Sequence, residues 1–448
     1  MKSRILWLIL VLFIVSGVSA QDSGLYVDAT ASLGTISPYV YGANLGQNAI
    51  IPLSLMPQAQ ALELGFARLG GGDSDRRDIQ LTSLDVFNYQ AREIGAEPLI
   101  TVRLLGGTPE DAAEAVRYVN IEKEYNIRYW SIGNEPNIFL STMDTPYTTE
   151  DLNREWRAIA EAMLAVDPTI LFVGPDITQY VPLSIDSGTI TYLEGNGGGS
   201  PRDSEGRDWL QEFLRANGDL LSVVSLHRYP YPGGTPNGSA TVAGLQATVA
   251  EWDVSIPNLR QIIREAAGRD IPLAITEINS NSNLACGGEA GVDSFFNALW
   301  LTDVLGRLIR NQVEIVTVWD IQGVGPRCYG LLTRDGVRPV YYTYMMYTHF
   351  GTELLAAESA NPDISIYAAQ REDGALTLMI VNWATEAQTE TLSIEGFSAS
   401  GDAEVWLFDA APGAPHNAEQ IDSETVNDGT EIMLQAQSVT VYVIPGTN

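Results

Sequence analysis

Tyr129-Trp130-Ser131-Ile132-Gly133-Asn134-Glu135-Pro136 is a short apolar run that ends in a glycine, an amide and a carboxylate. Apolar residues on both faces of such a run are typical of a strand buried in a parallel sheet. Pro136 disfavours the α conformation at the residue before it, so we expect an extended backbone at Glu135. The stretch therefore predicts a buried strand with a carboxylate held at its C-terminal tip.

Similar apolar runs recur along the chain. Segments whose apolar residues recur with helical spacing lie between several of them. The eight runs are residues 39–45, 65–70, 97–105, 127–133, 170–175, 221–229, 271–278 and 313–321. The helical segments are residues 56–64, 84–94, 108–118, 149–166, 208–216, 256–267 and 293–310. Eight strands that alternate with helices predict an α/β fold, the (β/α)8 TIM barrel. The alternative is an open doubly wound sheet, but no Gly-x-Gly-x-x-Gly turn follows the first strand.

The pattern of apolar and polar residues changes after the barrel. Residues 364–370, 376–383, 388–394, 403–408 and 432–444 alternate or are β-branched, and turn residues separate most of them. This pattern predicts a C-terminal antiparallel β-sandwich. Residues 24–37 also alternate, and we expect them to pair into that sandwich. The predicted organisation is thus an N-terminal strand region at 21–38, a barrel at 39–352 and a β-sandwich at 353–448.

The first 20 residues have the pattern of a secretory signal peptide. Lys2 and Arg4 precede an apolar run over residues 5–15, and small residues follow at Val18-Ser19-Ala20. The alternative is a membrane anchor, but the run is shorter than the roughly 20 apolar residues that a spanning helix needs. We therefore expect a secreted or periplasmic protein that has no membrane association after cleavage.

The charge of the chain is strongly negative. The full sequence carries a net charge of −31, and loss of Lys2 and Arg4 would leave 23 basic against 56 acidic residues, a net charge of −33. Such a surface repels nucleic acid and anionic membranes, so we expect neither as a partner. The three histidines, His227, His349 and His416, are far apart and show no metal-ligand spacing. We therefore expect no metal and no other cofactor.

A second strand also ends in a carboxylate, in Leu273-Ala274-Ile275-Thr276-Glu277. Taken singly, Glu135 could be an exposed turn residue and Glu277 a salt-bridged structural one. Counted along the barrel, however, they end strands four and seven and project into the same mouth. Two carboxyl groups about 5–5.5 Å apart can cleave a glycosidic bond with retention, one as general acid/base and one as nucleophile.

The pattern resembles glycoside hydrolase clan A, whose members place the acid/base after strand four and the nucleophile after strand seven. Asn134-Glu135-Pro136 matches the acid/base motif, and Glu277 matches the nucleophile. The resemblance implies that Asn134 binds the 2-hydroxyl of the sugar. His227-Arg228-Tyr229 matches the clan's His-x-Tyr, which implies that Tyr229 orients the nucleophile and that His227 lies near the acid/base or the substrate.

Further candidates come from the other strands. Arg68 matches an arginine that pairs with the nucleophile, and Trp319 matches an aromatic sugar platform; the alternatives are a structural ion pair and a core tryptophan. Asn44 and Asp176, after strands one and five, are candidate substrate contacts. Four polar residues in predicted rim loops are taken as solvated instead: Asp73, Asp75, Asp320 and Gln322.

The family within the clan is left open. Residues 67–73 and 276–300 look most like families 79 and 44, while families 39, 30 and 51 share the layout. Because no family's full motif set is present, the carbohydrate substrate is not specified. Two alternatives to a glycosidase also stay open, namely a carbohydrate-binding barrel without catalysis and a transglycosylase with the same first half-reaction.

Two cysteines, Cys286 and Cys328, fall in the loops after strands seven and eight. Adjacent loops make a disulfide geometrically plausible, and an exported chain favours one. It would close a loop of about 42 residues, worth roughly 4 kcal/mol in the chain-entropy model. The alternative is two free thiols.

Overall fold

The computed structural model describes residues 24–447 apart from residue 48, the segments 187–188, 193–200, 232–239, 283–286 and 324–327, residue 335 and the segment 411–417. The predicted signal peptide at residues 1–20 lies outside this range and stays a prediction. Across the described residues, no helix combines the length and the apolar character required to span a bilayer.

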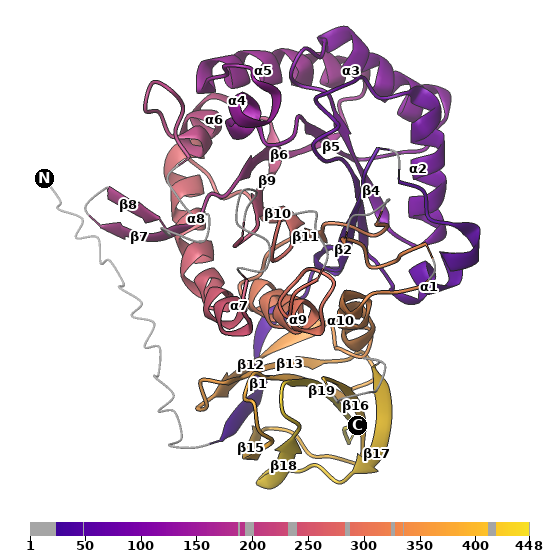
Figure 1. Cartoon of the computed structure of the whole chain (residues 1–448), viewed down its shortest axis with the longest axis vertical. Coiled ribbons are helices and arrows are strands. Elements are labelled where there is room, and N and C mark those ends of the chain that lie inside the picture. Colours follow the sequence, from indigo (N-terminus) through magenta and orange to yellow (C-terminus); the bar gives the residue numbers. More distant parts are fainter. Residues whose placement is uncertain are drawn as a thin grey trace, which may run out of the picture.

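Eight parallel strands close into a barrel in the order β10-β11-β2-β3-β4-β5-β6-β9, as Figure 1 shows from the mouth side. Their bounds are β2 Gly42–Leu45, β3 Phe66–Leu69, β4 Glu97–Val102, β5 Tyr129–Ile132, β6 Leu171–Thr178, β9 Leu221–Arg228, β10 Leu273–Ile278 and β11 Ile315–Val318. Each strand lies within a predicted run, except that β6 continues past Pro175 to Thr178. The predicted barrel is confirmed.

Helices surround the barrel (Figure 1). Seven match the predicted segments: α1 Met56–Ala61, α2 Leu81–Glu93, α3 Pro109–Val116, α5 Thr149–Val166, α6 Trp209–Asn217, α8 Glu251–Ala267 and α9 Phe295–Arg310. The sequence did not predict α4 Phe139–Met143, α7 Val242–Val249 or α10 Pro339–Tyr347. Helix α5 begins at the predicted residue because Thr148 and Asp151 form a capping box. Helix α8 begins five residues before its predicted start because it accommodates Pro257 in its interior.

Short elements connect these helices and strands. One-turn 3-10 helices are η1 Pro38–Val40, η2 Leu53–Leu55 and η4 Pro136–Ile138, and a π-helical turn, η3 Arg117–Glu122, extends α3. The hairpin of β7 Pro182–Asp186 and β8 Thr189–Tyr192 projects from the barrel beside α8 (Figure 1).

The remaining strands form the predicted second domain, completed by the N-terminal strand β1. Its nine strands follow the order β17-β16-β19-β14-β13-β12-β1-β15-β18. The bounds are β1 Leu25–Thr35, β12 Glu353–Ser359, β13 Ile364–Gln370, β14 Leu376–Asn382, β15 Gln388–Glu395, β16 Ala403–Asp409, β17 Glu419–Glu424, β18 Thr430–Leu434 and β19 Ser438–Ile444. Strand β1 pairs antiparallel with β12 and parallel with β15, so both faces of the sandwich belong to one curled sheet around an apolar core.

The β-domain packs against the barrel through α9, and Asp303 of that helix is central to the contact. Its buried carboxylate accepts hydrogen bonds from Trp383 Nε1 at 2.7 Å and Ser365 Oγ at 3.1 Å, and also from the Tyr367 hydroxyl. A Cβ on Gly306 would lie 2.3 Å from the Tyr367 ring, so glycine permits this close approach of helix and strand. The domain thus attaches at α9 and α10, to one side of the barrel mouth (Figure 1).

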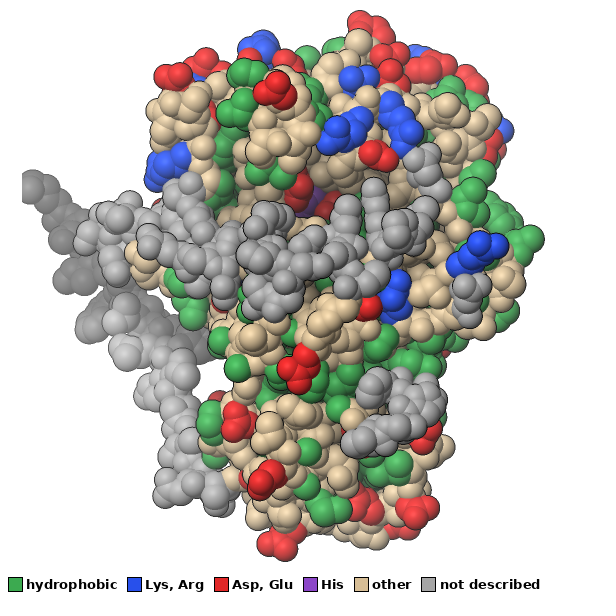
Figure 2. Space-filling model, in the orientation of Figure 1, with side chains coloured by type: hydrophobic (Ala, Val, Ile, Leu, Met, Phe, Trp, Pro, Cys, Tyr) green, Lys and Arg blue, Asp and Glu red, His purple; other side chains and the backbone are tan. Residues whose placement is uncertain are grey.

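The surface carries the acidic character of the sequence. On the face drawn in Figure 2, acidic side chains are spread over both domains, while basic side chains are visible only on the barrel. A histidine and acidic side chains lie at the bottom of a recess in the barrel on this same face.

Candidate active site

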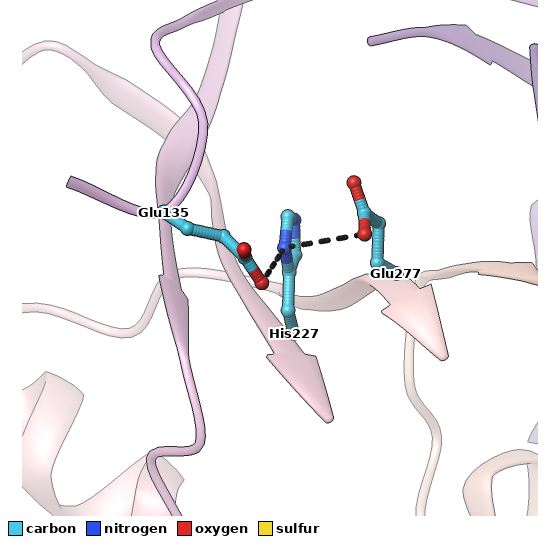
Figure 3. A group of neighbouring side chains, drawn as sticks. All are labelled: Glu135, His227 and Glu277. Carbon is cyan, nitrogen blue, oxygen red and sulfur yellow. Dashed lines mark hydrogen bonds and ion pairs between the residues drawn. The ribbon is translucent and has the colours of Figure 1, made fainter. Parts of the chain in front are cut away.

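The two carboxylates predicted from the sequence meet at the C-terminal end of the barrel. Glu135 follows β5, Glu277 belongs to β10, and both point toward the ring of His227 from opposite sides (Figure 3). His227 Nδ1 lies 3.1 Å from Glu135 Oε1 and 3.8 Å from Glu277 Oε2. The ring nitrogen and one carboxylate oxygen of each glutamate lie within 4.8 Å of one another. The side chain of Glu135 is 19% exposed and that of Glu277 is 7% exposed.

One guanidinium group, that of Arg68 in β3, joins four side chains from four different strands or strand tips. Its Nη1 donates to Asn44 Oδ1 and to Glu277 Oε1, each at 3.0 Å. Its Nη2 donates to Asn134 Oδ1 and to Asp176 Oδ2, each at 2.9 Å. The predicted pairing of Arg68 with Glu277 is therefore present, and the same group also orients the Asn134 amide.

Asn44 and Asp176 lie beneath the carboxyl pair. Both are fully buried, and Asp176 also accepts hydrogen bonds from the hydroxyls of Ser131, Ser225 and Thr276. The Asn44 amide donates to carbonyls of β10 and β11. Neither side chain is exposed and both contact Arg68, and their role as substrate contacts stays a prediction.

Strand β9 and the residue after it supply two neighbours of Glu277. The Tyr229 hydroxyl donates to Glu277 Oε2 at 2.8 Å, which is the orienting contact that the resemblance implies. His227 is 1% exposed and contacts both glutamates. Between them, Arg228 faces away from the site and forms a bidentate pair with Glu251 of α8 at 2.7 and 2.8 Å. This buried pair anchors the strand tip that carries His227 and Tyr229.

Burial and charge shift the pKa values of these groups in opposite directions. Burial alone would raise the pKa of Asp176, but Arg68 and His227 hold it well below its usual range. Burial alone would lower the pKa of His227, but Glu277, Asp176 and Glu135 raise it to about 9. Burial raises the pKa of Glu277, and His227 and Arg68 oppose that rise. Two cations, His227 and Arg68, therefore act on the Glu277 carboxylate.

The backbone of Glu135 differs from the prediction. Its φ of 52° and ψ of 52° are left-handed, not extended. The chain must reverse from β5 into η4 over Gly133 and Asn134, and the Glu135 amide donates to the Asp176 carbonyl at 3.2 Å. These tertiary contacts outweigh the local preference of a residue before proline. A non-glycine residue in this region is uncommon and often marks a functional site.

The tip of β5 is held from the side of β6 as well. The side-chain amide of Asn137 donates to the Thr178 carbonyl at 3.0 Å and accepts from the Thr178 amide at 3.0 Å. This reciprocal pair fixes the chain just after Glu135. Nothing in the sequence distinguished Asn137 from an ordinary loop asparagine.

Three of the four rim residues that the sequence indicated as solvated are buried. Asp75, Asp320 and Gln322 are 2%, 7% and 6% exposed, whereas Asp73 is exposed and pairs with Arg77. Asp75 accepts three backbone amide hydrogen bonds at the tips of β4 and β5. Burial raises the pKa of Asp75 to about 6, while these bonds and Arg103 oppose the rise. The polar loop around Asp75 gave no sign of this burial.

Trp319 follows β11 and is partly exposed above an apolar cluster that includes Val292 and Tyr329. Its ring fits against Gly71, where an added Cβ would lie 2.2 Å from Cη2 of the indole. A Cβ on Gly70 would lie 2.7 Å from Cζ of Arg68. The two glycines therefore provide room for a candidate sugar platform and for the central guanidinium, which explains the Gly-Gly pair after β3.

Cys328 is buried in the same cluster. Its predicted partner, Cys286, lies outside the described residues. The disulfide stays a prediction.

No protein-family model matches the chain, and no curated protein matches its sequence. Solved structures do match its fold. A bifunctional glucanase-xylanase, CelM2 from a metagenome library, aligns over 95% of this chain and 99% of its own, with 19% identity and a TM-score of 0.73. An α-L-arabinofuranosidase from Thermotoga maritima covers 95% of this chain and 100% of its own, with 18% identity and a TM-score of 0.72. A family 44 endoglucanase, Cel44A from Clostridium thermocellum, covers 94% and 99%, with 17% identity and a TM-score of 0.70.

This is the fold of glycoside hydrolase families 44 and 51. Family 44 was suggested by sequence motifs and family 51 by its shared layout, so the resemblance to clan A is confirmed at the level of the fold. The match extends over nearly all of the described chain, including the curled β-domain.

The geometry of Glu135, His227 and Glu277 could in principle hold a metal ion, although their spacing in the sequence gave no sign of it. The chemistry of the group does not favour this. The neighbouring carboxylates raise the pKa of His227 to about 9, so its ring would have to lose a proton before it could bind a metal. Arg68 already pairs with Glu277, so the carboxylates of this glycoside hydrolase fold are balanced by the protein's own cations.

The elevated pKa of His227 can be measured directly. We expect its ring to titrate near pH 9 in the folded protein, because three carboxylates surround it. Protonation then stabilises the fold fully below about pH 6.5, the unfolded-state value, and this contribution is lost as the pH rises through 9. Heteronuclear NMR of labelled histidines would report it, with His227→Gln for assignment. His349, whose pKa burial lowers, is the internal control. A midpoint at or below 6.5 for His227 would contradict the described charge network.

Replacing Arg68 should lower the free energy of unfolding by an amount that depends on pH. Arg68→Met leaves Asp176 and Glu277 buried without that cation, and we expect a loss of about 3–5 kcal/mol in the free energy of unfolding at pH 7. Burial then raises both carboxyl pKa values, so the loss should shrink toward pH 4, where the carboxyls become protonated.

Urea unfolding at pH 7 and pH 4 measures this difference. Arg77→Met is the matched control, because Arg77 makes an exposed ion pair with Asp73. We expect that control to change stability by less than about 1 kcal/mol at either pH. An equal loss for Arg68→Met at both pH values would show that its charge is not what stabilises the site.

Proposed function

We propose that this chain is an exported, retaining glycoside hydrolase in which Glu135 is the general acid/base and Glu277 the nucleophile. The observation that carries the proposal is the approach of the two carboxylates. One oxygen of Glu135 lies within 4.8 Å of one oxygen of Glu277, which suits the separation of about 5–5.5 Å in retaining enzymes better than the 6.5–9.5 Å of inverting ones. The fold shared with known glycoside hydrolases supports the same conclusion.

The reaction follows from the positions of the two groups. Glu135 donates its proton to the leaving glycosidic oxygen while Glu277 attacks the anomeric carbon, which breaks the bond and forms a glycosyl–Glu277 ester. Glu135, now ionised, removes a proton from a water that attacks the same carbon. The ester bond breaks, Glu277 is released as a carboxylate, and two inversions leave the configuration unchanged.

The neighbouring side chains prepare this pair. Arg68 and Tyr229 each bind one oxygen of Glu277, so the carboxylate is oriented and partly neutralised before it attacks. Because Arg68 binds Asn134 Oδ1, the NH2 group of that amide is left to donate to a sugar hydroxyl. Trp319 offers an aromatic face beside the site, and sugars commonly stack on such faces. Asn44 and Asp176 position Arg68 from below.

The substrate class can be narrowed by charge. Arg68 is committed to internal carboxylates, and His227 faces the two glutamates. A neutral sugar therefore fits the described site better than a uronic acid. The structural neighbours are named as a glucanase-xylanase, a xyloglucanase and arabinofuranosidases. We propose glucose-, xylose- or arabinose-containing poly- or oligosaccharides as the substrates to test first.

Activity on a panel of aryl glucosides, xylosides and arabinofuranosides and of the corresponding polysaccharides tests the proposal. We expect Glu277→Gln to abolish turnover, and Glu135→Gln to reduce it by roughly 10²–10⁴-fold. Glu358→Gln, an exposed glutamate of β12, is the matched control and should behave as the wild type. In the presence of azide, Glu277→Gly should yield a glycosyl azide of inverted configuration, and Glu135→Ala one of retained configuration.

Turnover that survives Glu277→Gln would exclude Glu277 as nucleophile. Binding of polysaccharide without any hydrolysis would indicate the non-catalytic alternative, and longer oligosaccharide products at high acceptor concentration would indicate transglycosylation.

Export is proposed from the sequence of residues 1–20 alone. We expect protein recovered from the medium or periplasm to begin at Gln21, which N-terminal sequencing would determine. A retained Met1 on the recovered protein would exclude cleavage of a signal peptide.

A further inference from the structure

Asp75 lies in the loop after β3, yet its carboxylate is almost completely buried, with the residue 2% exposed. Its Oδ1 accepts from the backbone amides of Leu104 and Leu105 at 2.8 and 2.9 Å, just after β4. Its Oδ2 accepts from the backbone amide of Asn134 at 2.7 Å, just after β5. One carboxylate thus joins the tips of two neighbouring barrel strands.

The bond from the Asn134 amide to Asp75 lies directly before Glu135, the proposed acid/base. On the side of β6, the Glu135 amide and the Asn137 side chain are bonded to β6 residues. From below, Arg68 holds the Asn134 side chain. Toward β4, the Gly133 amide donates to the Val102 carbonyl at 2.9 Å, and Asp75 adds the contact at the next residue, Asn134. Without Asp75, the turn would be bonded to β4 only up to Gly133, two residues before Glu135.

Packing makes the coupling between the two tips tighter. Gly133 has a φ of 80°, and a Cβ added there would lie 2.7 Å from the Leu104 side chain. The turn before Glu135 therefore rests against the same residue whose amide Asp75 binds. A shift of Leu104 would be transmitted to Gly133 and from there to Glu135.

The chemistry of the contact requires a carboxylate. An ionised carboxylate accepts at both oxygens, and its hydrogen bonds to amides are stronger than those of a neutral acceptor. The nearest cation, Arg103, instead donates to Asp78 and to the Leu105 carbonyl. An asparagine at this position would direct an NH2 group at one of the three amide donors, and that bond would be lost.

We propose that Asp75 is a positioning residue for Glu135, because it clamps the β4 and β5 tips and so fixes the direction from which the acid/base approaches the leaving oxygen. The role of Glu135 in this statement rests on the proposed function. The clamp itself rests on the three hydrogen bonds and the burial.

The catalytic test compares leaving groups. Asp75→Asn and its control Asp73→Asn are assayed on aryl glycosides of the sugar that the wild type hydrolyses best. A 2,4-dinitrophenolate leaves without a proton, whereas phenolate needs one from Glu135. We expect Asp75→Asn to lower kcat/KM at least about 10-fold for the phenyl glycoside, and less than about 3-fold for the dinitrophenyl glycoside. Asp73, which is exposed two residues away, should leave both values unchanged when replaced.

The rates on the two leaving groups distinguish the possible outcomes. Equal losses on both leaving groups would overturn the assignment to Glu135, because a general disturbance of the site does not depend on the leaving group. Wild-type rates on both substrates would overturn the proposal entirely.

A second measurement does not need activity. Hydrogen exchange followed by mass spectrometry should show faster exchange in the peptides around 104–105 and 133–138 for Asp75→Asn, and no change for Asp73→Asn. Unchanged exchange would overturn the clamp. If Asp75→Asn does not fold, Asp75→Ser, whose small hydroxyl can still accept one bond, is measured in the same way. If the wild type hydrolyses none of the panel, the proposed function fails, and the exchange data still decide whether Asp75 joins the two tips.

Discussion

The Arg68 guanidinium is the interaction on which the site depends. Buried at the centre of the barrel mouth, it binds Asn44, Asn134, Asp176 and Glu277, and these residues come from four separate strands or strand tips. A planar group with donors in a fixed fork can set several acceptors relative to one another, which the ammonium group of lysine cannot do. The barrel provides the walls, but this one cation converts the ends of its strands into a site of defined geometry.

The burial of the Arg68 guanidinium determines which groups must surround it. A cation without solvent is stable only if carboxylates accompany it, and Asp176 and Glu277 fulfil this requirement. Asp176 then needs further donors, which the hydroxyls of Ser131, Ser225 and Thr276 supply. These polar side chains therefore form one connected network, and Gly70 leaves the space that the Arg68 guanidinium needs.

Much of the fold and the centre of the site could be predicted from the sequence, because they depend on local patterns. Barrel strands are apolar on both faces, and a carboxylate at the end of such a run stands out, as with Glu135 and Glu277. Helix α5 was located by its helical period. The parts that could not be predicted depend on distant residues. Asp75 is buried only because the tips of β4 and β5 surround it, and the backbone of Glu135 is left-handed because the neighbouring strand β6 binds its amide. The β-domain is one curled sheet because β1 pairs on both sides, which alternation of residues does not indicate.

The balance of charge in the site bears on the two roles proposed for its glutamates. With Asp176, Glu135 and Glu277 ionised and with Arg68 and His227 protonated, the group carries one negative charge in excess. A single proton therefore makes it neutral, and burial favours the neutral state. Glu277 is bound by Arg68 and Tyr229, so its oxygens are committed as acceptors. Glu135 is the more exposed of the two, and among the described residues its side chain contacts only His227. The same network thus fixes both oxygens of Glu277 and leaves the side chain of Glu135, on the opposite side of the mouth, with fewer contacts.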